Sequence, residues 1–377
     1  MNWQLTTYGG VLHNGYLWFS NNTFNGLFRM RMENGEIEFV DFFPNETLGQ
    51  TFSHKKCLAF KDRLYFFPAL GNYITIYDVQ NVQFSSIEFP RGKADSCSDA
   101  VLVDDKIYIF PADNQSDLFC LDTKTDSLQA IPSFRKQYAT LIGTQESYLL
   151  CRVSYSEGKF IFAFFETDIV ATFDLGKESL LAFHTGVPHL FAAFGHTGTV
   201  YLTTNNTTEI FQYDFVNSPM RIYSEEEINS EQRRFNQICF IDKTVFALPA
   251  FWGYVVKLQN ENGCQLSELF HESEKEKKTG NPEEIEEQQK KAKSNTAVIL
   301  SFGYLYVSNH LLLFPFMKNF FYEINEEGKI IHKFPFLLTD QKSRCELMGK
   351  WFLDGVDKFI YEADDFSLKG LIDVLRK

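Results

Sequence analysis

The sequence lacks long apolar runs and clustered cysteines. No stretch of about 18 or more apolar residues occurs, so we expect no transmembrane helix and no membrane insertion. The first residues, MNWQLTTYGG, lack the basic and apolar regions of a signal peptide. The 7 cysteines occur singly, with no Cys-x-x-Cys pair, which is typical of free thiols in a reducing compartment. We therefore expect a cytoplasmic protein.

A net basic charge and catalytic motifs are also missing. The formal net charge of −13 disfavours a nucleic-acid binder, because phosphate contacts need a basic surface. The chain has no Gly-x-Ser-x-Gly, no phosphate-binding glycine loop, no His-Glu-x-x-His and no zinc spacing. The closest histidines, His184, His189 and His196, are not spaced to share one strand face. We expect no metal and no cofactor, and we favour a protein without enzymatic activity.

Aromatic residues are abundant. They make up 16% of the sequence, with 40 phenylalanines. Bulky aromatic side chains favour β-strands, so the composition predicts an all-β protein.

One pattern recurs along the whole chain. The stretch DDKIYIFPADNQSDLFCLDTKTDSLQAI, residues 104–131, contains an apolar run, a loop, a second run that closes on a polar residue, and a polar turn. The closing polar residues of the successive copies are Arg31, Asp78, Asp122, Asp174, Asp214, Gln259, Asn325 and, weakly, Asp364. A period of about 40–50 residues with several short strands per unit indicates a β-propeller. We predict a single propeller domain over 1–377, with seven blades and eight as the alternative.

The four strands of a blade, A to D from the channel outward, can be placed in the third copy. They are predicted at Ala100–Val103, Lys106–Phe110, Asp117–Asp122 and Ser127–Ile131. The two residues between A and B fit a tight hairpin. The aspartate that closes strand C is expected to accept backbone N–H bonds in the C–D turn.

The repeats resemble kelch repeats. The shared features are a strand pair of the form SDAVLVDDKIYIF and a Tyr-Asp-like close of strand C, as in IYDVQN and QYDFVN. This resemblance implies a propeller fold. The chain departs from the kelch pattern in two ways: the tryptophan near strand D is replaced by Ile, Leu or Phe, and the Gly-Gly after strand B is replaced by Pro68-Ala69, Pro111-Ala112, Pro249-Ala250 and Pro315-Phe316.

Two segments differ from the repeats. The charged insert 272–295 contains a predicted helix over Asn281–Lys293 and is either a solvated loop or a docking arm for a partner. The C-terminal copy has apolar residues at helical spacing, which predicts a helix over 367–376. We expect a strand pair just before that helix to close the ring.

The candidate binding residues lie on loops of one face. The D–A and B–C connections share a face of a propeller, and loops on a rigid scaffold often carry function. Basic residues stand shortly before strand A in several copies, and aromatic residues follow strand B. The predicted ligand-binding set is Arg91, Arg135, Arg233, Arg344, His54, His189 and Trp252. Arginine contacts with ring stacking suit an anionic ligand.

Three functions fit this pattern. The preferred one is a binding module that recognises a glycan or a partner protein at the D–A/B–C face, with an anionic ligand as one option. The first alternative is a lyase or hydrolase acting on an acidic sugar in the channel mouth. The second alternative is a structural scaffold of a larger assembly. Propellers host both binding modules and enzymes, so the fold does not decide between those two.

Overall fold

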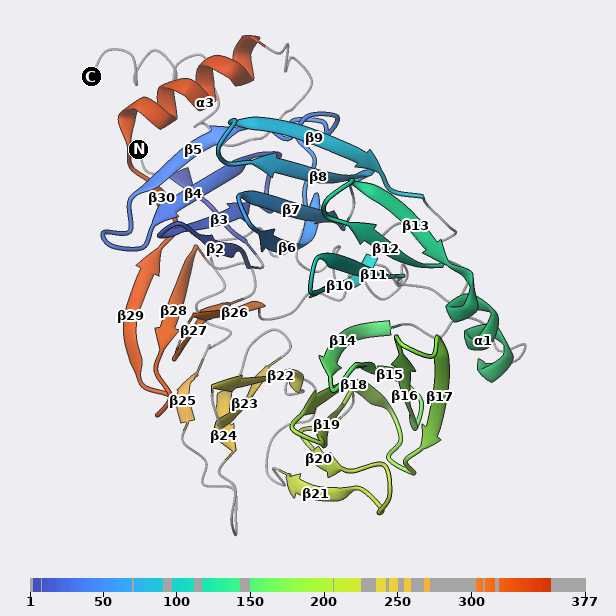
Figure 1. The fold of residues 1–377 in the computed structure, drawn as a ribbon. Coiled ribbons are helices and arrows are strands. Elements are labelled where there is room, and N and C mark those ends of the chain that lie inside the picture. The colour runs from blue at the N-terminus through green and yellow to red at the C-terminus, as the bar shows by residue number, and fades with distance from the viewer. Residues whose placement is uncertain are drawn as a thin grey trace.

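A computed structural model describes residues 3–7, 9–69, 71–90, 97–111, 117–142, 150–205, 207–224, 235–241, 244–249, 254–258, 268–271, 303–307, 309–315 and 319–353. Within these residues it contains seven four-stranded antiparallel sheets, each built from four consecutive strands in the order of the chain. Figure 1 shows the sheets arranged around a ring, with the first strand of each sheet innermost. The predicted all-β propeller with seven blades is confirmed.

The first four blades occupy the N-terminal part of the chain. Blade 1 is β2 (Val11–His13), β3 (Tyr16–Ser20), β4 (Leu27–Arg31) and β5 (Ile37–Asp41). Blade 2 is β6 (His54–Phe60), β7 (Arg63–Pro68), β8 (Tyr73–Asp78) and β9 (Gln83–Glu88). Blade 3 is β10 (Cys97–Val103), β11 (Lys106–Pro111), β12 (Leu118–Asp122) and β13 (Ser127–Ile131). Blade 4 is β14 (Leu150–Ser156), β15 (Lys159–Phe164), β16 (Ile169–Asp174) and β17 (Ser179–His184).

Three blades complete the ring. Blade 5 is β18 (Leu190–His196), β19 (Thr199–Thr204), β20 (Ile210–Tyr213) and β21 (Met220–Tyr223). Blade 6 is β22 (Phe235–Ile241), β23 (Thr244–Pro249), β24 (Tyr254–Leu258) and β25 (Glu268–His271). Blade 7 is β26 (Gly303–Val307), β27 (His310–Phe314), β28 (Phe320–Ile324) and β29 (Ile330–Pro335).

Tight turns join strands A and B. The first turn residue has a left-handed backbone in five blades, as at Lys61 (φ 53°) and Asp104 (φ 54°). In three of these blades a glycine with positive φ follows: Gly15, Gly158 and Gly198. Two consecutive left-handed residues match the twist of a two-residue hairpin. The two-residue A–B connection predicted from sequence is confirmed.

Strand A carries a bulge near its start in five consecutive blades, blades 2 to 6. The register against strand B shifts between His54 and Lys56, and the corresponding shift follows Cys97 and Phe235 in blades 3 and 6. The other two shifts lie between Leu150 and Val153 and between Leu190 and Ala192. A bulge bends the strand and re-aims the side chains beside it. The D–A/B–C end of the channel is therefore shaped in the same way by several blades.

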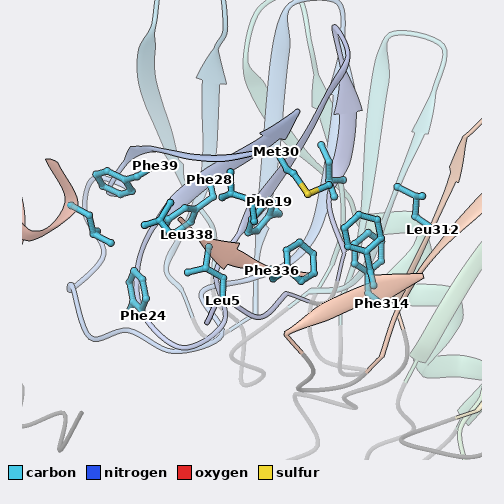
Figure 2. Packing of buried hydrophobic residues seen from close by; sticks show 14 of the residues in the cluster. Leu5, Phe19, Phe24, Phe28, Met30, Phe39, Leu312, Phe314, Phe336 and Leu338 are labelled. Carbon is cyan, nitrogen blue, oxygen red and sulfur yellow. The ribbon is translucent and has the colours of Figure 1, made fainter. Parts of the chain in front are cut away.

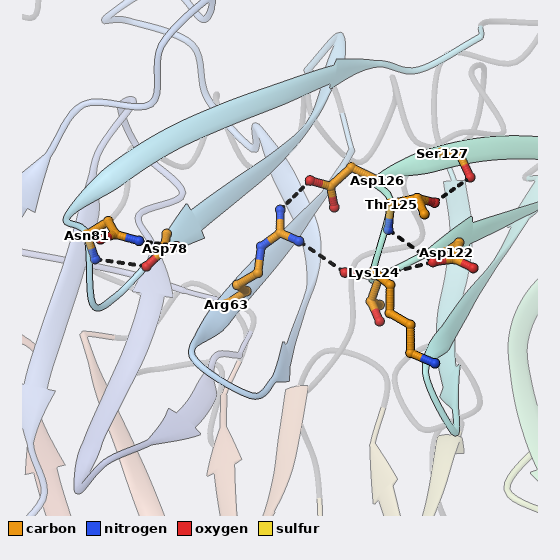
Figure 3. A network of polar contacts seen from close by, with 9 residues as sticks. Arg63, Asp78, Asn81, Asp122, Lys124, Thr125, Asp126 and Ser127 are labelled. Atoms are coloured by element: carbon orange, nitrogen blue, oxygen red, sulfur yellow. Dashed lines mark hydrogen bonds and ion pairs between the residues drawn. The ribbon is translucent and has the colours of Figure 1, made fainter.

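Aspartates close the C–D turns as the sequence predicted. Oδ1 of Asp122 accepts the backbone N–H groups of Lys124 and Thr125 at 2.9 and 3.1 Å. Asp78 accepts the N–H of Asn81 at 2.9 Å (Figure 3). Asp174 and Asp214 make the same kind of contact with their own turns. These backbone hydrogen bonds hold the pKa values of Asp78, Asp122 and Asp214 below the ordinary carboxyl value.

An arginine links blades 2 and 3 at the end of the sheets that carries the A–B and C–D turns. The Arg63 guanidinium donates to Oδ2 of Asp126 at 2.5 Å and to the backbone oxygen of Thr123 at 3.1 Å (Figure 3). The hydrogen bond with Asp126 raises the pKa of Arg63. Because both acceptors belong to the C–D turn of blade 3, this residue fixes one blade against the next.

The ring is closed between blades 7 and 1. β1 (Trp3–Gln4) pairs antiparallel with β30 (Leu337–Leu338), and Leu5 N–H donates to the Phe336 oxygen at 3.0 Å. Phe336 is fully buried, 5.0 Å from the Phe19 ring centroid, in the cluster that both blades share (Figure 2). Burying a phenylalanine contributes about 1.5–3 kcal/mol. Aromatic packing at this seam therefore holds the first and last blades together.

Two helices occur among the described residues: the expected short helix after the last blade is confirmed as a feature of the fold, and the helix after blade 3 was not predicted. α1 (Pro132–Ile142) follows blade 3 and packs on β17, while α3 (Gln341–Leu353) follows blade 7 and packs on β5 (Figure 1). The N-terminus of α3 is capped by Asp340, whose carboxylate accepts Ser343 N–H at 2.6 Å. Residues 350–353, which were expected to start a closing strand, form the last turn of α3.

Several predictions concern segments beyond the described residues. The helix over Asn281–Lys293 within the insert 272–295, and the C-terminal helix over 367–376, both lie outside them. The alternative of an eighth blade is not supported, because the residues after blade 7 that the structure describes form β30 and α3 instead of four strands.

Candidate binding site at the end of the central channel

A cavity of about 240 Å³ lies in the central channel, at the end where strand A starts and strand B finishes. This end carries the D–A and B–C connections. Most of its polar lining comes from the first residues of strand A in different blades: His54, Lys55 and Lys56 of β6, Arg152 of β14, Gln237 of β22 and Tyr304 of β26. Ring closure therefore brings residues far apart in the sequence around one small space.

A partly buried charge contact beside the cavity joins blades 2 and 3. Nζ of Lys56 lies 3.1 Å from Oδ1 of Asp99, whose side chain is only 5% exposed. The same carboxylate accepts backbone N–H groups from Ala100 and Val153 at 2.9 and 3.2 Å. Burial alone would raise the pKa of Asp99, but Lys56 and Arg152 together with the Val153 N–H outweigh it and the pKa is lowered. Asp99 is therefore an anion that three blades hold in place.

Tyr304 and Gln237 face the same region from blades 7 and 6. Burial raises the pKa of the Tyr304 hydroxyl, and Asp99 adds to the shift, while Arg152 and a hydrogen bond with Gln237 oppose it. Gln237 is 6% exposed, and its Oε1 has no hydrogen-bond partner among the residues that the structure describes. The electrostatic influence of Asp99 and Arg152 on Tyr304 shows that the charges and the phenol share one environment.

His54 forms the wall of the cavity next to blade 1. Its side chain is buried, and Nδ1 lies 3.0 Å from the Ser20 hydroxyl. The imidazole packs against the rings of Phe43 and Phe66, and burial lowers its pKa to about 3. Nε2 is buried and has no hydrogen-bond partner in the described part of the chain. His54 is therefore a neutral group at physiological pH, with one polar atom still to be satisfied.

The residues predicted from sequence do not all reach this cavity. His54 lines it. His189 lies before β18, where it is exposed and Nδ1 is 2.7 Å from Oε2 of Glu166. Arg135 is exposed on α1 and Arg344 is half-buried on α3, and both helices pack against strands of the outer blade edge. Arg91, Arg233 and Trp252 lie outside the described residues.

The basic triplet His54–Lys56 stood among the basic segments expected before strand A, whereas Arg152 and Gln237 were missed because they lie within strand A. Lys56, Asp99 and Gln237 each occupy the third position of strand A, just before its apolar part. A charged or amide side chain at the same position of strand A in several repeats was therefore the sequence feature that could have indicated these site residues. The bulge that places these residues at the channel is a feature of register, which hydrophobic pattern does not reveal.

Two further observations concern the described residues alone. They contain no cluster of three or more His, Cys, Asp or Glu suited to a metal ion. None of their helices is long and apolar enough to cross a membrane.

The comparisons with known proteins identify the fold. No family model and no curated protein matches the sequence. Solved structures with a similar fold include the computationally designed Ika8 protein, with a TM-score of 0.54, 9% identity, and coverage of 88% of this chain and 87% of that one. Dihydro-heme d1 dehydrogenase NirN in complex with DHE has a TM-score of 0.54, 10% identity, and coverage of 88% and 68%.

A third similar structure is an extracellular domain from B. thetaiotaomicron, belonging to a protein described as a one component system. Its TM-score is 0.55 at 11% identity, over 83% of this chain. The present chain spans 37% of that longer chain. Likeness at such low identity establishes the propeller fold and gives no ligand.

Proposed function

We propose that this propeller is a non-enzymatic binding module that holds an anionic group, carried by a glycan or a partner protein, in the channel cavity at the D–A/B–C face. The observation that carries the proposal is the charge of the lining. Lys55, Lys56 and Arg152 meet there, with Asp99 as the neighbouring anion. In a chain of net charge −13, this local excess of positive charge favours an anion through charge-assisted hydrogen bonds.

The titration behaviour of the lining supports binding over catalysis. Burial lowers the pKa of His54 to about 3 and raises that of Cys57 to about 12. The pKa of Tyr304 is raised as well. A general acid or base works best with a pKa near the working pH. The pKa values of these three groups lie far from pH 7, so each group keeps one protonation state near neutral pH.

The finer classification is part of the same proposal. We propose that the blades are kelch-like in the strand pair and in the Tyr-Asp close of strand C, and that the protein acts in the cytoplasm. The buried thiols of Cys97 and Cys239 support a reducing compartment. Arg91, Arg233, His189 and Trp252 remain proposed contacts for the parts of a ligand that extend beyond the cavity, and Arg135 and Arg344, at the outer blade edge, remain proposed contacts for a larger partner.

The test is a panel of anionic glycans and acidic peptides probed with the wild type, Arg152→Ala and Lys55→Ala. Each substitution should weaken binding about tenfold, the range of a charge-assisted hydrogen bond, and binding should weaken as salt is added. The matched control is Lys106→Ala, since Lys106 is exposed beside an A–B turn at the other end of the channel. Equal loss in the control, or no binding by any anion, contradicts the proposal.

A further inference from the structure

We infer that the ligand of the channel cavity is a sugar acid, in which one residue carries a carboxylate and several hydroxyls, as in a hexuronate. This inference rests on the proposed function and narrows it. A glycan is favoured over an acidic peptide, because the size of the cavity and the neutral side chains of its lining disfavour a peptide.

The size of the cavity sets the first limit. Its volume is about 240 Å³, slightly below the range of about 300–1,000 Å³ that is typical of ligand sites. A space of this size suits one monosaccharide residue. A longer chain would place the remaining residues on the loops outside.

The lining has a cationic part and a neutral part. Lys55, Lys56 and Arg152 form the cationic part, which suits a carboxylate. Lys56 is already 3.1 Å from Asp99, so the site is not a purely cationic cluster that would favour a highly charged ion such as phosphate. One carboxylate matches this balance of charge.

The neutral part of the lining favours a ligand with hydroxyl groups. Oε1 of Gln237 can only accept a hydrogen bond, and it has no partner among the described residues. A carboxylate, sulfate or fully ionised phosphate has no proton to donate to it. A sugar hydroxyl does, and pairing such an atom removes the free-energy cost of leaving it buried and unsatisfied.

His54 also favours a ligand with hydroxyl groups. Its Nε2 also has no partner in the described residues, and burial keeps the ring neutral with a pKa of about 3. The contact of Nδ1 with Ser20 permits either tautomer, so Nε2 is either a donor or an acceptor. A hydroxyl satisfies both cases, because it can donate and accept.

Aromatic residues complete the match. Tyr304 and Tyr306 also line the cavity, and Tyr306 is 48% exposed. A pyranose ring presents apolar C–H groups between its hydroxyls, and these can pack against aromatic side chains. Binding sites of small ligands commonly combine aromatic side chains with a few placed polar groups.

Titration calorimetry with matched small probes separates the inference from the proposed function. The probes are glucuronate and galacturonate, the neutral sugars glucose and galactose, cyclohexanecarboxylate as a ring acid without hydroxyls, and an oligoglutamate peptide. At least one uronate should bind about tenfold more tightly than its neutral sugar and than cyclohexanecarboxylate.

Gln237→Leu should reduce the affinity for that uronate about tenfold and leave the affinity for cyclohexanecarboxylate unchanged. Gln129→Leu, at an exposed position of β13, is the matched control and should change neither. Thermal unfolding of each variant checks that the ring is intact.

Three outcomes overturn the inference. Equal binding of cyclohexanecarboxylate and uronates removes the role of the hydroxyls while the anion site stands. Tighter binding of oligoglutamate assigns the site to an acidic protein segment. If none of the anions binds, the proposed function fails together with the inference.

Discussion

Two ion pairs join blade 2 to blade 3 at opposite ends of the same two sheets. At the turn end, Arg63 binds Asp126 and also the Thr123 oxygen, so a C–D turn holds the cation from two sides. At the channel end, Lys56 contacts one oxygen of Asp99 and also lines a cavity. Both pairs fix the angle between neighbouring blades. Only the channel end combines this role with open space and with polar atoms of His54 and Gln237 that the described residues leave without partners.

The difference indicates how a repeat fold separates stability from binding. Turn aspartates such as Asp78 and Asp122 satisfy backbone groups within a few residues of themselves. The polar residues at the start of strand A instead meet across the channel, from blades that are distant in the sequence. Polar contacts within a turn thus stabilise single blades, whereas polar residues from several blades that meet at the channel form the site.

The largest expected effect concerns the pH dependence of stability set by His54. Its pKa is about 3 in the folded state and 6.5 ordinarily, so the unfolded chain binds the extra proton first as pH falls. The stabilising contribution is present above pH about 6.5 and is lost toward pH 3, with about 3 kcal/mol lost by pH 4.

Urea unfolding at pH 7 and pH 4 measures this loss. His54→Gln removes the titrating ring and should reduce the stability difference between the two pH values by about 3 kcal/mol. His184→Gln, at an exposed position of β17, should keep the wild-type difference. An unchanged pH dependence in His54→Gln contradicts the buried, neutral state of this residue.

The next largest effect is expected from Asp99→Ala. The substitution leaves Lys56 and the buried Val153 N–H without this carboxylate, and we expect a loss of about 2 kcal/mol in the free energy of unfolding. Glu88→Ala, at an exposed position of β9, is the control. A loss no greater than that of Glu88→Ala would show that Asp99 does not hold the blades together.

Arg63→Ala should cost less, because Arg63 and Asp126 remain 25% and 35% exposed. We expect about 1 kcal/mol, since water screens a pair of this kind. A double-mutant cycle with Asp126→Ala measures the coupling directly. If the coupling at Arg63 exceeds that of a Lys56/Asp99 cycle, the proposed ranking of the two ends is wrong.

The smallest effect is expected at a C–D turn. The lowered pKa of Asp122 means that its ionised form is stabilised in the fold, so the contribution is present above the ordinary carboxyl pKa and disappears as pH falls through the folded value. Asp122→Asn should therefore lower the melting temperature slightly at pH 7 and leave it unchanged near pH 2.5. A difference that persists at the lower pH would contradict the turn role of the carboxylate.

The sequence predicted the blade more completely than it predicted the site. The turn aspartates and the bounds of β13 agree with the prediction because turn chemistry and strand pattern are local. α1 was missed although Pro132 opens it and Phe134 and Tyr138 are one turn apart, both buried against blades 3 and 4. The connection was interpreted as a loop because its basic residues, including Arg135, were assumed to face the channel.

The site residues needed three-dimensional information. His54 was predicted because it precedes an apolar strand, and the structure places it in the cavity. Arg152 and Gln237 were not, since only the bulges of β14 and β22 and the closure of the ring place them beside His54. Hydrophobic periodicity defines which strands form, but it does not fix such shifts in register.

A crystal structure of the protein soaked with the uronate that binds most tightly tests the central claim most directly. The account predicts the sugar in the channel cavity, with its carboxylate within hydrogen-bond distance of Arg152, Lys55 or Lys56 and a hydroxyl beside Gln237. A cavity that contains only water while the uronate lies elsewhere, for example on α1 near Arg135, would contradict it.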